Sequence, residues 1–286
     1  FIDIYKVPDD AMVPGHVWIR LKPELSGQLQ RLEHENGTLV SFGIVELDEL
    51  NRRFEVSKIS QIFYSPAHRS EFTQRHRDWG LHLWYEISFA SKADIRDVVM
   101  AYRGLEGSVA WAEPEYKKVL YEAVVGQNQE PETLNRWTPN DPYYSSQWHY
   151  NNTGQQGGTV DCDIDLPEAW DLEKGHQDVI VAVIDGGIQT NHPDLNNNIW
   201  SGVGYNFVTG SSTINPEDHG THVAGTIAAE NNNSTGVCGI AGGNGNTKGA
   251  SLMSCQVFDG QNQGGFANAP VWAADNGAAI SQNSWG

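Results

Sequence analysis

The sequence predicts two units of different fold class: a small α+β domain, then an α/β domain with a parallel sheet flanked by helices. In the first part of the chain, apolar and polar residues alternate, as they do in half-buried strands. From about residue 140, continuous apolar runs alternate with helical patterns, which is typical of a parallel sheet. The charge changes between the two parts, because residues 1–126 carry a net charge of −4 and residues 127–286 carry −14.

The first unit is predicted to combine antiparallel strands with a helix. The alternating segments "HVWIRL" (residues 16–21) and "GLHLWYEISF" (residues 80–89) predict half-buried strands. Ser91 and Asp94 have the spacing of a helix capping box, and apolar residues follow them at helical intervals. The segment "GSVAWAEPEYKKVL" (residues 107–120) predicts a final strand whose proline favours a sheet edge.

The second unit is predicted to contain buried parallel strands. "VIVAVID" (residues 179–185) is continuously apolar and rich in β-branched residues, which indicates a strand buried on both faces. A helix is predicted from His219, a second strand at residues 251–258 and a second helix at residues 267–276. Functional groups of such sheets gather beyond the carboxyl ends of the strands, where Asp185 lies. The two glycines after Asp185 are expected to allow a sharp turn.

Two stretches receive no element prediction. Residues 40–77 show no clear periodicity, and residues 125–142 are polar and hold three prolines, as linkers and surface loops do.

The bulk composition excludes several classes of protein. A net charge of −18 argues against nucleic-acid binding, which favours basic surfaces. No apolar run approaches the roughly 18 residues that a membrane helix requires. Three cysteines are too few for a disulfide framework, so we expect buried free thiols.

Asp185 and His219 are the residues with the chemistry of a hydrolytic site. A carboxylate at the end of a buried strand can orient an imidazole at the start of a helix, and the imidazole can take a proton from a nucleophilic hydroxyl. Either residue alone is more simply explained as a turn or helix-start residue. Their sequence surroundings decide between these interpretations.

The blocks around both residues resemble those of the subtilisin-like serine proteases. These blocks are "VAVIDGGIQTNHPDL" and "HGTHVAGTIAA", in the family's order of Asp before His. Shorter matches are "NDPYYSSQW", "LPEAWD" and "ISQNSWG", so the resemblance spans residues 140–286. It implies that Asp185 is the triad acid and His219 the general base, whereas His222 is structural. Gly220 and Gly225 fit close packing at the start of the helix.

A zinc site built on His219 and His222 is the competing interpretation of the histidine pair. Zinc proteases place two histidines at i and i+4 around a glutamate, in an H-E-x-x-H pattern. Here the spacing is i, i+3 and the residues between are Gly and Thr, so a metal-dependent hydrolase is the weaker hypothesis.

The resemblance also implies a substrate-binding region and a missing nucleophile. Ser284, Trp285 and Gly286 match the strand that pairs with the substrate backbone, and Gly264 and Gly265 match the opposite wall of the specificity pocket. The family's catalytic serine stands in a G-T-S block, and no such block occurs in this sequence. We therefore expect the proenzyme part of a longer protease that is inactive without the remaining C-terminal part of its catalytic domain.

The same resemblance implies a structural calcium site, because the polar loop after the histidine helix matches the family's strong site. Its oxygen-rich residues are of the kind that calcium prefers. The implied ligands are the side chains of Asp141, Asp194, Asn233 and Thr235 and the carbonyls of Glu230 and Val237. By contrast, "DCDID" (residues 161–165) only mimics the start of an EF-hand loop and is predicted to be a solvated strand or turn.

By resemblance, the first unit is a ferredoxin-like inhibitory propeptide. The domains are then residues 1–124 as the propeptide, 125–139 as the linker and 140–286 as the N-terminal portion of the catalytic domain. Autoprocessing is expected between residues 119 and 137. The implied protein is a secreted endopeptidase that acts on polypeptide substrates and has its own propeptide as an intramolecular inhibitor. The open alternative is a non-catalytic pseudoprotease or binding module of the same fold.

Overall fold

The computed structural model describes residues 4–29, 41–63, 70–90, 92–118 and 137–286. The chain divides into two compact units, Phe1–Val119 and Leu120–Gly286. Each unit has its own sheet and its own core, so the two are described separately.

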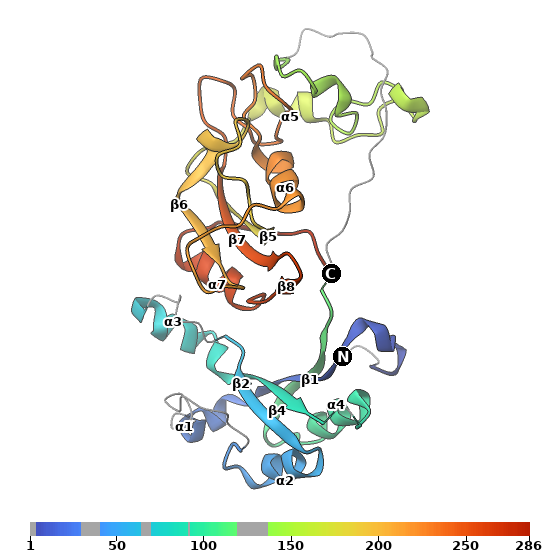
Figure 1. Cartoon of the computed structure of the whole chain (residues 1–286), viewed down its shortest axis with the longest axis vertical. Coiled ribbons are helices and arrows are strands. Elements are labelled where there is room, and N and C mark those ends of the chain that lie inside the picture. Colours follow the sequence, from blue (N-terminus) through green and yellow to red (C-terminus); the bar gives the residue numbers. More distant parts are fainter. Residues whose placement is uncertain (1–3, 30–40, 64–69, 91, 119–136) are drawn as a thin grey trace. The chain divides into compact units, whose positions relative to one another are not determined.

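A four-stranded antiparallel sheet forms the centre of the first unit (Figure 1). Its strands are β1 (Met12–Leu21), β2 (Val56–Gln61), β3 (Trp84–Phe89) and β4 (Val109–Tyr116), in the order β2-β3-β1-β4. The helices are α1 (Ser26–Leu29), α2 (Val45–Arg53), α3 (Thr73–Asp78) and α4 (Ile95–Arg103). Apart from the short α1 and α3, the chain order is β-α-β-β-α-β, a split βαβ arrangement.

One face of this sheet is covered and the other is open. Alternate residues of β1, such as Val17 and Ile19, are fully buried with Val98 and Val99 of α4. The intervening residues of β1 are partly exposed, because successive side chains of a strand point to opposite faces. The open face therefore carries the polar and aromatic half of the strand pattern.

The predicted strands of this unit are confirmed, and β4 with Pro114 lies at the sheet edge as expected. The predicted capping is corrected: the N-cap of α4 is Asp94, whose Oδ1 accepts a hydrogen bond from the Arg96 N–H at 2.8 Å. Ser91 lies outside the described residues. Residues 40–77, which received no element prediction, contain α2, β2 and α3. The sequence of β2 shows no apolar alternation, because only Ile59 of its six residues is buried.

The second unit contains a parallel sheet flanked by helices (Figure 1). Its strands are β5 (Ile180–Gly186), β6 (Ile199–Asn206), β7 (Ser251–Asp259) and β9 (Ile280–Asn283), in the order β6-β7-β5-β9. The short β8 (Asn262–Gln263) pairs antiparallel with β7. The helices are α5 (Leu166–Leu172), α6 (Asp218–Ala228) and α7 (Asn268–Asp275).

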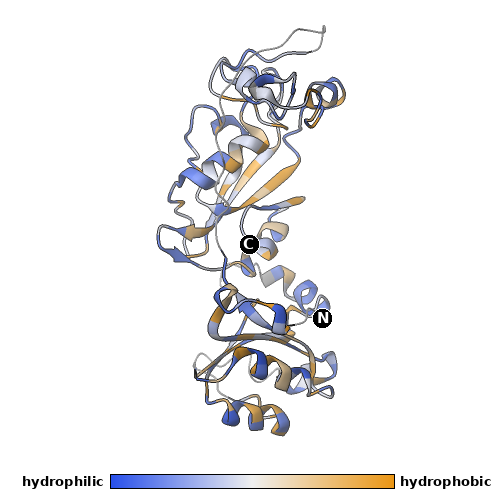
Figure 2. Ribbon diagram, turned by 90° about the vertical axis from the view of Figure 1, so that its right-hand side faces the viewer, coloured by the Kyte–Doolittle hydropathy of each residue, from blue (hydrophilic) through white to orange (hydrophobic). Residues whose placement is uncertain are grey.

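The core of this unit follows from its apolar strands, which are the strongly hydrophobic ribbons of Figure 2. Residues 181–186 of β5 are all buried, which confirms the prediction of a strand covered on both faces. Val181 and Val183 of β5 pack with Ala224 and Ala228 of α6. The sequence did not predict β6, because only two of its eight residues are buried.

Two further expectations concern loops and membranes. Residues 161–165 form a turn, as predicted, in which the Asp163 carboxylate accepts hydrogen bonds from the Asn152 N–H at 2.5 Å and the Asp165 N–H at 2.7 Å. Within the described ranges, no helix is long and apolar enough to cross a membrane.

Candidate active site

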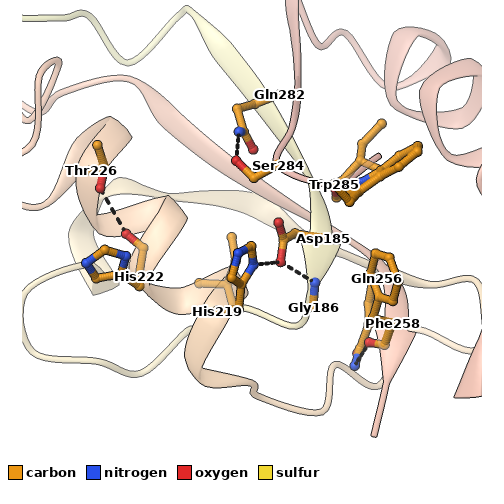
Figure 3. Close-up of polar contacts among 12 residues, drawn as sticks. Asp185, Gly186, His219, His222, Thr226, Gln256, Phe258, Gln282, Ser284 and Trp285 are labelled. Carbon is orange, nitrogen blue, oxygen red and sulfur yellow. Dashed lines mark hydrogen bonds and ion pairs between the residues drawn. The ribbon is translucent and has the colours of Figure 1, made fainter. Parts of the chain in front are cut away.

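The structure brings Asp185 and His219 into direct contact (Figure 3). Asp185 lies near the carboxyl end of β5 and is 0% exposed, whereas His219 is the second residue of α6. The Oδ1 atom of Asp185 is 2.7 Å from Nδ1 of His219. The imidazole keeps 19% of its side-chain surface exposed. A buried carboxylate therefore holds one ring nitrogen, while the ring remains open to solvent on another side.

Close backbone approach, rather than a sharp turn, explains the glycines of this site. Neither Gly186 nor Gly187 has a positive φ, which corrects the expectation of a sharp turn. A Cβ atom on Gly187 would lie 2.0 Å from the Asn215 carbonyl oxygen, and one on Gly220 would lie 2.0 Å from that of Gly186. The start of α6 can approach the end of β5 only because these positions lack side chains.

Gly225 does not share this role. A Cβ atom there would have no neighbour within 4 Å apart from its own helix. The prediction that both helix glycines serve close packing is thus correct for Gly220 and wrong for Gly225.

The electrostatics of Asp185 combine burial with partial hydrogen bonding. Burial raises the pKa of Asp185, and the hydrogen bonds from His219 and from the Gly186 N–H at 2.6 Å oppose that shift. The Oδ2 atom is buried and has no hydrogen-bond partner. A carboxylate that is poorly solvated in this way favours a neighbouring positive charge. The His219 imidazole, held by Asp185 through Nδ1, can carry that charge.

A buried glutamine that the sequence analysis missed holds the loop leading to His219. The Oε1 atom of Gln256 accepts hydrogen bonds from Asn206 Nδ2 at 3.0 Å and from the Asn215 N–H at 2.9 Å. Its Nε2 donates to the carbonyls of Asn215 at 3.0 Å and Phe258 at 2.9 Å. The sequence does place this polar residue in the middle of the apolar β7 segment. A fully buried amide needs hydrogen-bond partners, so its position could have indicated a structural role.

His222 takes no part in the contact between Asp185 and His219. It is exposed one turn further along α6, and its main-chain carbonyl accepts a hydrogen bond from the Thr226 hydroxyl (Figure 3). Among the described residues, no group of three metal-binding side chains includes His219 or His222. The side-chain arrangement therefore does not favour the zinc-site interpretation.

The two segments expected to bind substrate meet through their aromatic neighbours. Nε1 of Trp285 donates to the Ile184 carbonyl at 2.6 Å, immediately before Asp185. The Trp285 ring lies 4.9 Å from the ring of Phe266, and the Ser284 hydroxyl accepts a hydrogen bond from Gln282 at 2.5 Å.

Gly264 and Gly265 precede Phe266 and connect it to the strand next to β5. The Gly264 N–H donates to the Val257 carbonyl at 2.9 Å. Gly265 has a φ of +78°, and a Cβ atom there would lie 2.3 Å from Cβ of Phe207. The main chain is therefore fixed on both sides of the aromatic contact, while Gly286 ends the same segment as Trp285.

The loop after α6 is built around two buried carboxylates, Asp141 and Asp194. Asp141 accepts hydrogen bonds from the N–H groups of Asn232 at 2.7 Å and Asn233 at 3.3 Å. Asp194 accepts from the Asn233 amide at 2.8 Å and from the Val237 N–H at 3.0 Å. Three separate segments of the chain thus meet at this point.

The remaining implied ligands lie in the same loop with different contacts. The Thr235 N–H donates to Oδ1 of Asn233 at 2.7 Å. The Glu230 N–H donates to the Asp194 carbonyl at 2.9 Å, while the Glu230 carboxylate accepts from Asn197. The Glu230 side chain is therefore already engaged, and only its main chain is held at Asp194.

The charge of the loop fits a cation. Burial raises the pKa of Asp194, and the hydrogen bonds from Val237 and Asn233 oppose that shift; the charge of Asp141 raises the pKa further, whereas that of His192 lowers it. No Lys or Arg in the described part of the chain forms an ion pair with either carboxylate. A calcium ion with oxygen ligands would neutralise carboxylates buried in this way.

Comparisons with known proteins agree with these features. Residues 176–286 match the model of the subtilase family. The chain is 39% identical over 154 residues to thermitase of Thermoactinomyces vulgaris, covering 52% of this chain and 48% of that protein. It is 36% identical over 182 residues to the thermophilic serine proteinase of Bacillus sp. (strain AK1), covering 62% and 37% respectively. The chain thus spans less than half the length of these relatives.

The fold comparison extends over nearly the whole chain. The structure of fervidolysin from Fervidobacterium pennivorans, a keratinolytic enzyme related to subtilisin, matches with a TM-score of 0.56 at 19% identity, covering 98% of this chain and 37% of that one. At this identity the match shows a shared fold. The 176–286 segment is thus similar in sequence to the subtilase family, and the chain shares its fold with an enzyme related to subtilisin.

Proposed function

We propose that Asp185 and His219 are the acid and the general base of a serine endopeptidase. The observation that carries the proposal is the 2.7 Å hydrogen bond between a fully buried carboxylate and a partly exposed imidazole in a subtilase segment. In this mechanism Nε2 of His219 takes the proton of a serine hydroxyl as that oxygen attacks the substrate carbonyl. Asp185 stabilises the imidazolium, which then protonates the leaving amine.

The proposal assigns no nucleophile within these 286 residues, which contain no G-T-S block. A chain of these residues alone is therefore proposed to hydrolyse peptides negligibly. We place it as the proenzyme portion of a secreted enzyme whose catalytic domain is completed by further sequence. Its substrates are polypeptides, bound along Ser284–Gly286 with Gly264 and Gly265 on the opposite side. The meeting of these two segments at Trp285 and Phe266 supports this placement.

A fluorophosphonate probe tests the proposed mechanism, because it labels only an activated serine. We expect the full-length protein to be labelled and the 286-residue chain not to be. His219→Ala in the full-length protein should slow labelling at least about 100-fold, the usual contribution of a general base. His222→Ala, three residues along the same helix, is the matched control and should label normally. A folded full-length protein that resists the probe would instead establish the pseudoprotease alternative.

The first unit is proposed to be an inhibitory propeptide. Its split βαβ order and its edge strand β4, with Glu113 and Pro114 close to the end of the unit, support this role. The proposed boundaries remain 1–124, 125–139 and 140–286, and most of the proposed processing region, 119–137, lies outside the described residues. Added in trans, residues 1–124 should inhibit the mature enzyme; an enzyme indifferent to them would contradict the role.

A structural calcium ion is proposed for the loop after α6. Asp141 and Asp194 would supply its carboxylates, with oxygen atoms of Glu230, Asn233, Thr235 and Val237 completing the site. The convergence of three segments on two buried acids supports this assignment. The ion would neutralise these acids and hold the segments together.

A further inference from the structure

A cluster of metal-binding side chains lies on the sheet of the first unit. It consists of His16 on β1, Glu86 on β3 and Glu115 on β4, whose ligand atoms lie within 4.8 Å of one another. Nδ1 of His16 is 2.8 Å from Oε1 of Glu86 and 3.9 Å from Oε2 of Glu115. In the described part of the chain, this is the one group of three such side chains.

The strand register explains why residues so distant in sequence meet. β1 lies between β3 and β4, and its His16 is opposite Ser88, two positions from Glu86 on the same face. On the other side Val17 is opposite Pro114, which places Glu115 beside His16. All three side chains therefore project from the open face of one sheet.

A β-bulge next to His16 adds to this arrangement. The register between β1 and β4 shifts between Met12 and Val17, and Gly15 in this interval has a φ of +79°. A Cβ atom on Gly15 would lie 2.9 Å from the Phe89 carbonyl oxygen. Bulges of this kind re-aim the neighbouring side chain and are frequent beside functional sites. Here the re-aimed side chain is the only imidazole of the cluster.

We propose that His16, Glu86 and Glu115 bind a zinc-class divalent ion, with water as the fourth ligand. Ligands about 2.1 Å from a tetrahedral zinc ion are separated from one another by roughly 3.4 Å. The separations of Glu86 Oε1 and Glu115 Oε2 from His16 Nδ1, 2.8 and 3.9 Å, lie on either side of that value. Binding requires only small side-chain movements and releases any proton on Nδ1 to solvent.

The ligand chemistry selects the ion. An imidazole nitrogen suits zinc and its neighbours in the transition series, whereas calcium and magnesium prefer oxygen alone. Two carboxylates balance the two positive charges. The side chains of His16, Glu86 and Glu115 are 35%, 29% and 21% exposed, so an ion can enter from solvent.

Lys118 is the group that opposes binding. Its Nζ is 3.4 Å from Oε1 of Glu115 and lies 5.1 Å from the centre of the Trp18 ring. This contact occupies one oxygen of Glu115 and leaves Oε2 toward His16. A positive charge so close to the site lowers its affinity for another cation, so removing it should strengthen binding.

Zinc titration calorimetry on the 286-residue chain, in excess calcium to fill oxygen-only sites, tests the inference. We expect a zinc-binding event that weakens at least tenfold in both His16→Gln and Glu115→Gln. Glu113→Gln is the matched control, because Glu113 lies on the same strand and face opposite Trp18. It should bind as the wild type does, and Lys118→Gln should bind more tightly. Cobalt substitution should give a visible spectrum that His16→Gln abolishes.

The competing explanation is that the three side chains share a proton, as a histidinium between two carboxylates. In that case zinc binding would be absent at 100 µM metal, or equal in the wild type, His16→Gln and Glu115→Gln, and the inference would be overturned. Circular dichroism of each variant establishes that it is folded. None of these measurements depends on proteolysis, so the zinc site and the proposed peptidase mechanism stand or fall separately.

Discussion

Gly220 and Gly225 show how two identical residues on one helix can have opposite effects on stability. Gly220 allows α6 to approach the Gly186 carbonyl, whereas Gly225 is buried but has room for a Cβ atom, with no neighbour within 4 Å outside its own helix. Glycine costs a helix about 1 kcal/mol relative to alanine. Glycine is therefore the better residue only at a position where the side chain of alanine would clash with a neighbour.

We therefore expect Gly220→Ala to lower the free energy of unfolding by about 2 kcal/mol, the usual cost of overpacking. Gly225→Ala should raise it by up to about 1 kcal/mol through helix propensity. Urea unfolding followed by circular dichroism measures both. Equal effects of the two substitutions would show that the close approach to Gly186 does not control this helix.

The ionisation of Asp185 is expected to oppose folding. Burial raises its pKa in the folded protein, so the folded state binds the proton more tightly than the unfolded state does. The stabilising contribution of the protonated form is complete below the unfolded pKa of about 4 and is lost as pH rises through the folded pKa. Asparagine imitates the protonated carboxyl at every pH.

Asp185→Asn should therefore unfold at a higher urea concentration than the wild type at pH 7, and the difference should shrink as pH falls through the folded pKa and disappear below about pH 4. The matched control is Asp178→Asn, because the Asp178 side chain is 82% exposed and should give no such difference. A less stable Asp185→Asn protein at pH 7 would mean that the contact with His219 outweighs the burial of charge.

The sequence indicated Asp185 and His219 but not what surrounds them. Both stand in long, distinctive blocks at the end of a strand and the start of a helix, so the pattern alone places them. Gln256 and the cluster around His16 carry no such local signal. Their partners are tens of residues away, and only the strand register brings them together.

At the scale of elements, apolar periodicity predicted the strands and helices that bury a full face. β5, β7, α6 and α7 were recognised because burial leaves a strong pattern. β2 and β6 were missed because each has at most two fully buried residues. Loop conformation was likewise beyond prediction, since it depends on contacts such as those of Gln256.

The loop between β6 and α6 depends on β7 for its conformation. Gln256→Met removes four hydrogen bonds, three of which join Gln256 to main-chain groups of Asn215 and Phe258. A hydrogen bond contributes about 0.5–1.5 kcal/mol to stability, so we expect the loss of four to destabilise the protein by about 3 kcal/mol. Hydrogen exchange at the Asn215 amide should accelerate more than exchange in β5.

Gln263→Met, on the exposed β8, is the control for that experiment. It removes a glutamine of the same size without touching the loop. A similar loss of stability in both variants would show that side-chain replacement, rather than the hydrogen bonds of Gln256, is responsible.

At the scale of the whole molecule, the proposed calcium ion should affect one unit and not the other. Its ligands all lie in Leu120–Gly286, and they join three segments that are distant in sequence. In protein free of zinc, calorimetry should therefore show a transition that a calcium chelator shifts downward and another, from the first unit, that it leaves unchanged.

Asp194→Ala should lower the calcium-sensitive transition when calcium is present, by about 4 °C or more for a loss of about 2 kcal/mol. In chelator the variant should unfold with the wild type. An equal loss in both conditions would show that Asp194 stabilises the loop through its hydrogen bonds alone.

The strand order β6-β7-β5-β9 also affects how the chain folds during its synthesis. β5 is made first, yet its neighbours in the sheet are β7 and β9, which begin at Ser251 and Ile280. Roughly 65 residues separate the end of β5 from β7, which corresponds to about 3–13 s of synthesis at about 5–20 residues per second. During that interval an apolar, β-branched strand has no partner in its sheet. The nascent chain must be shielded for those seconds, or its most hydrophobic strand will pair with another molecule.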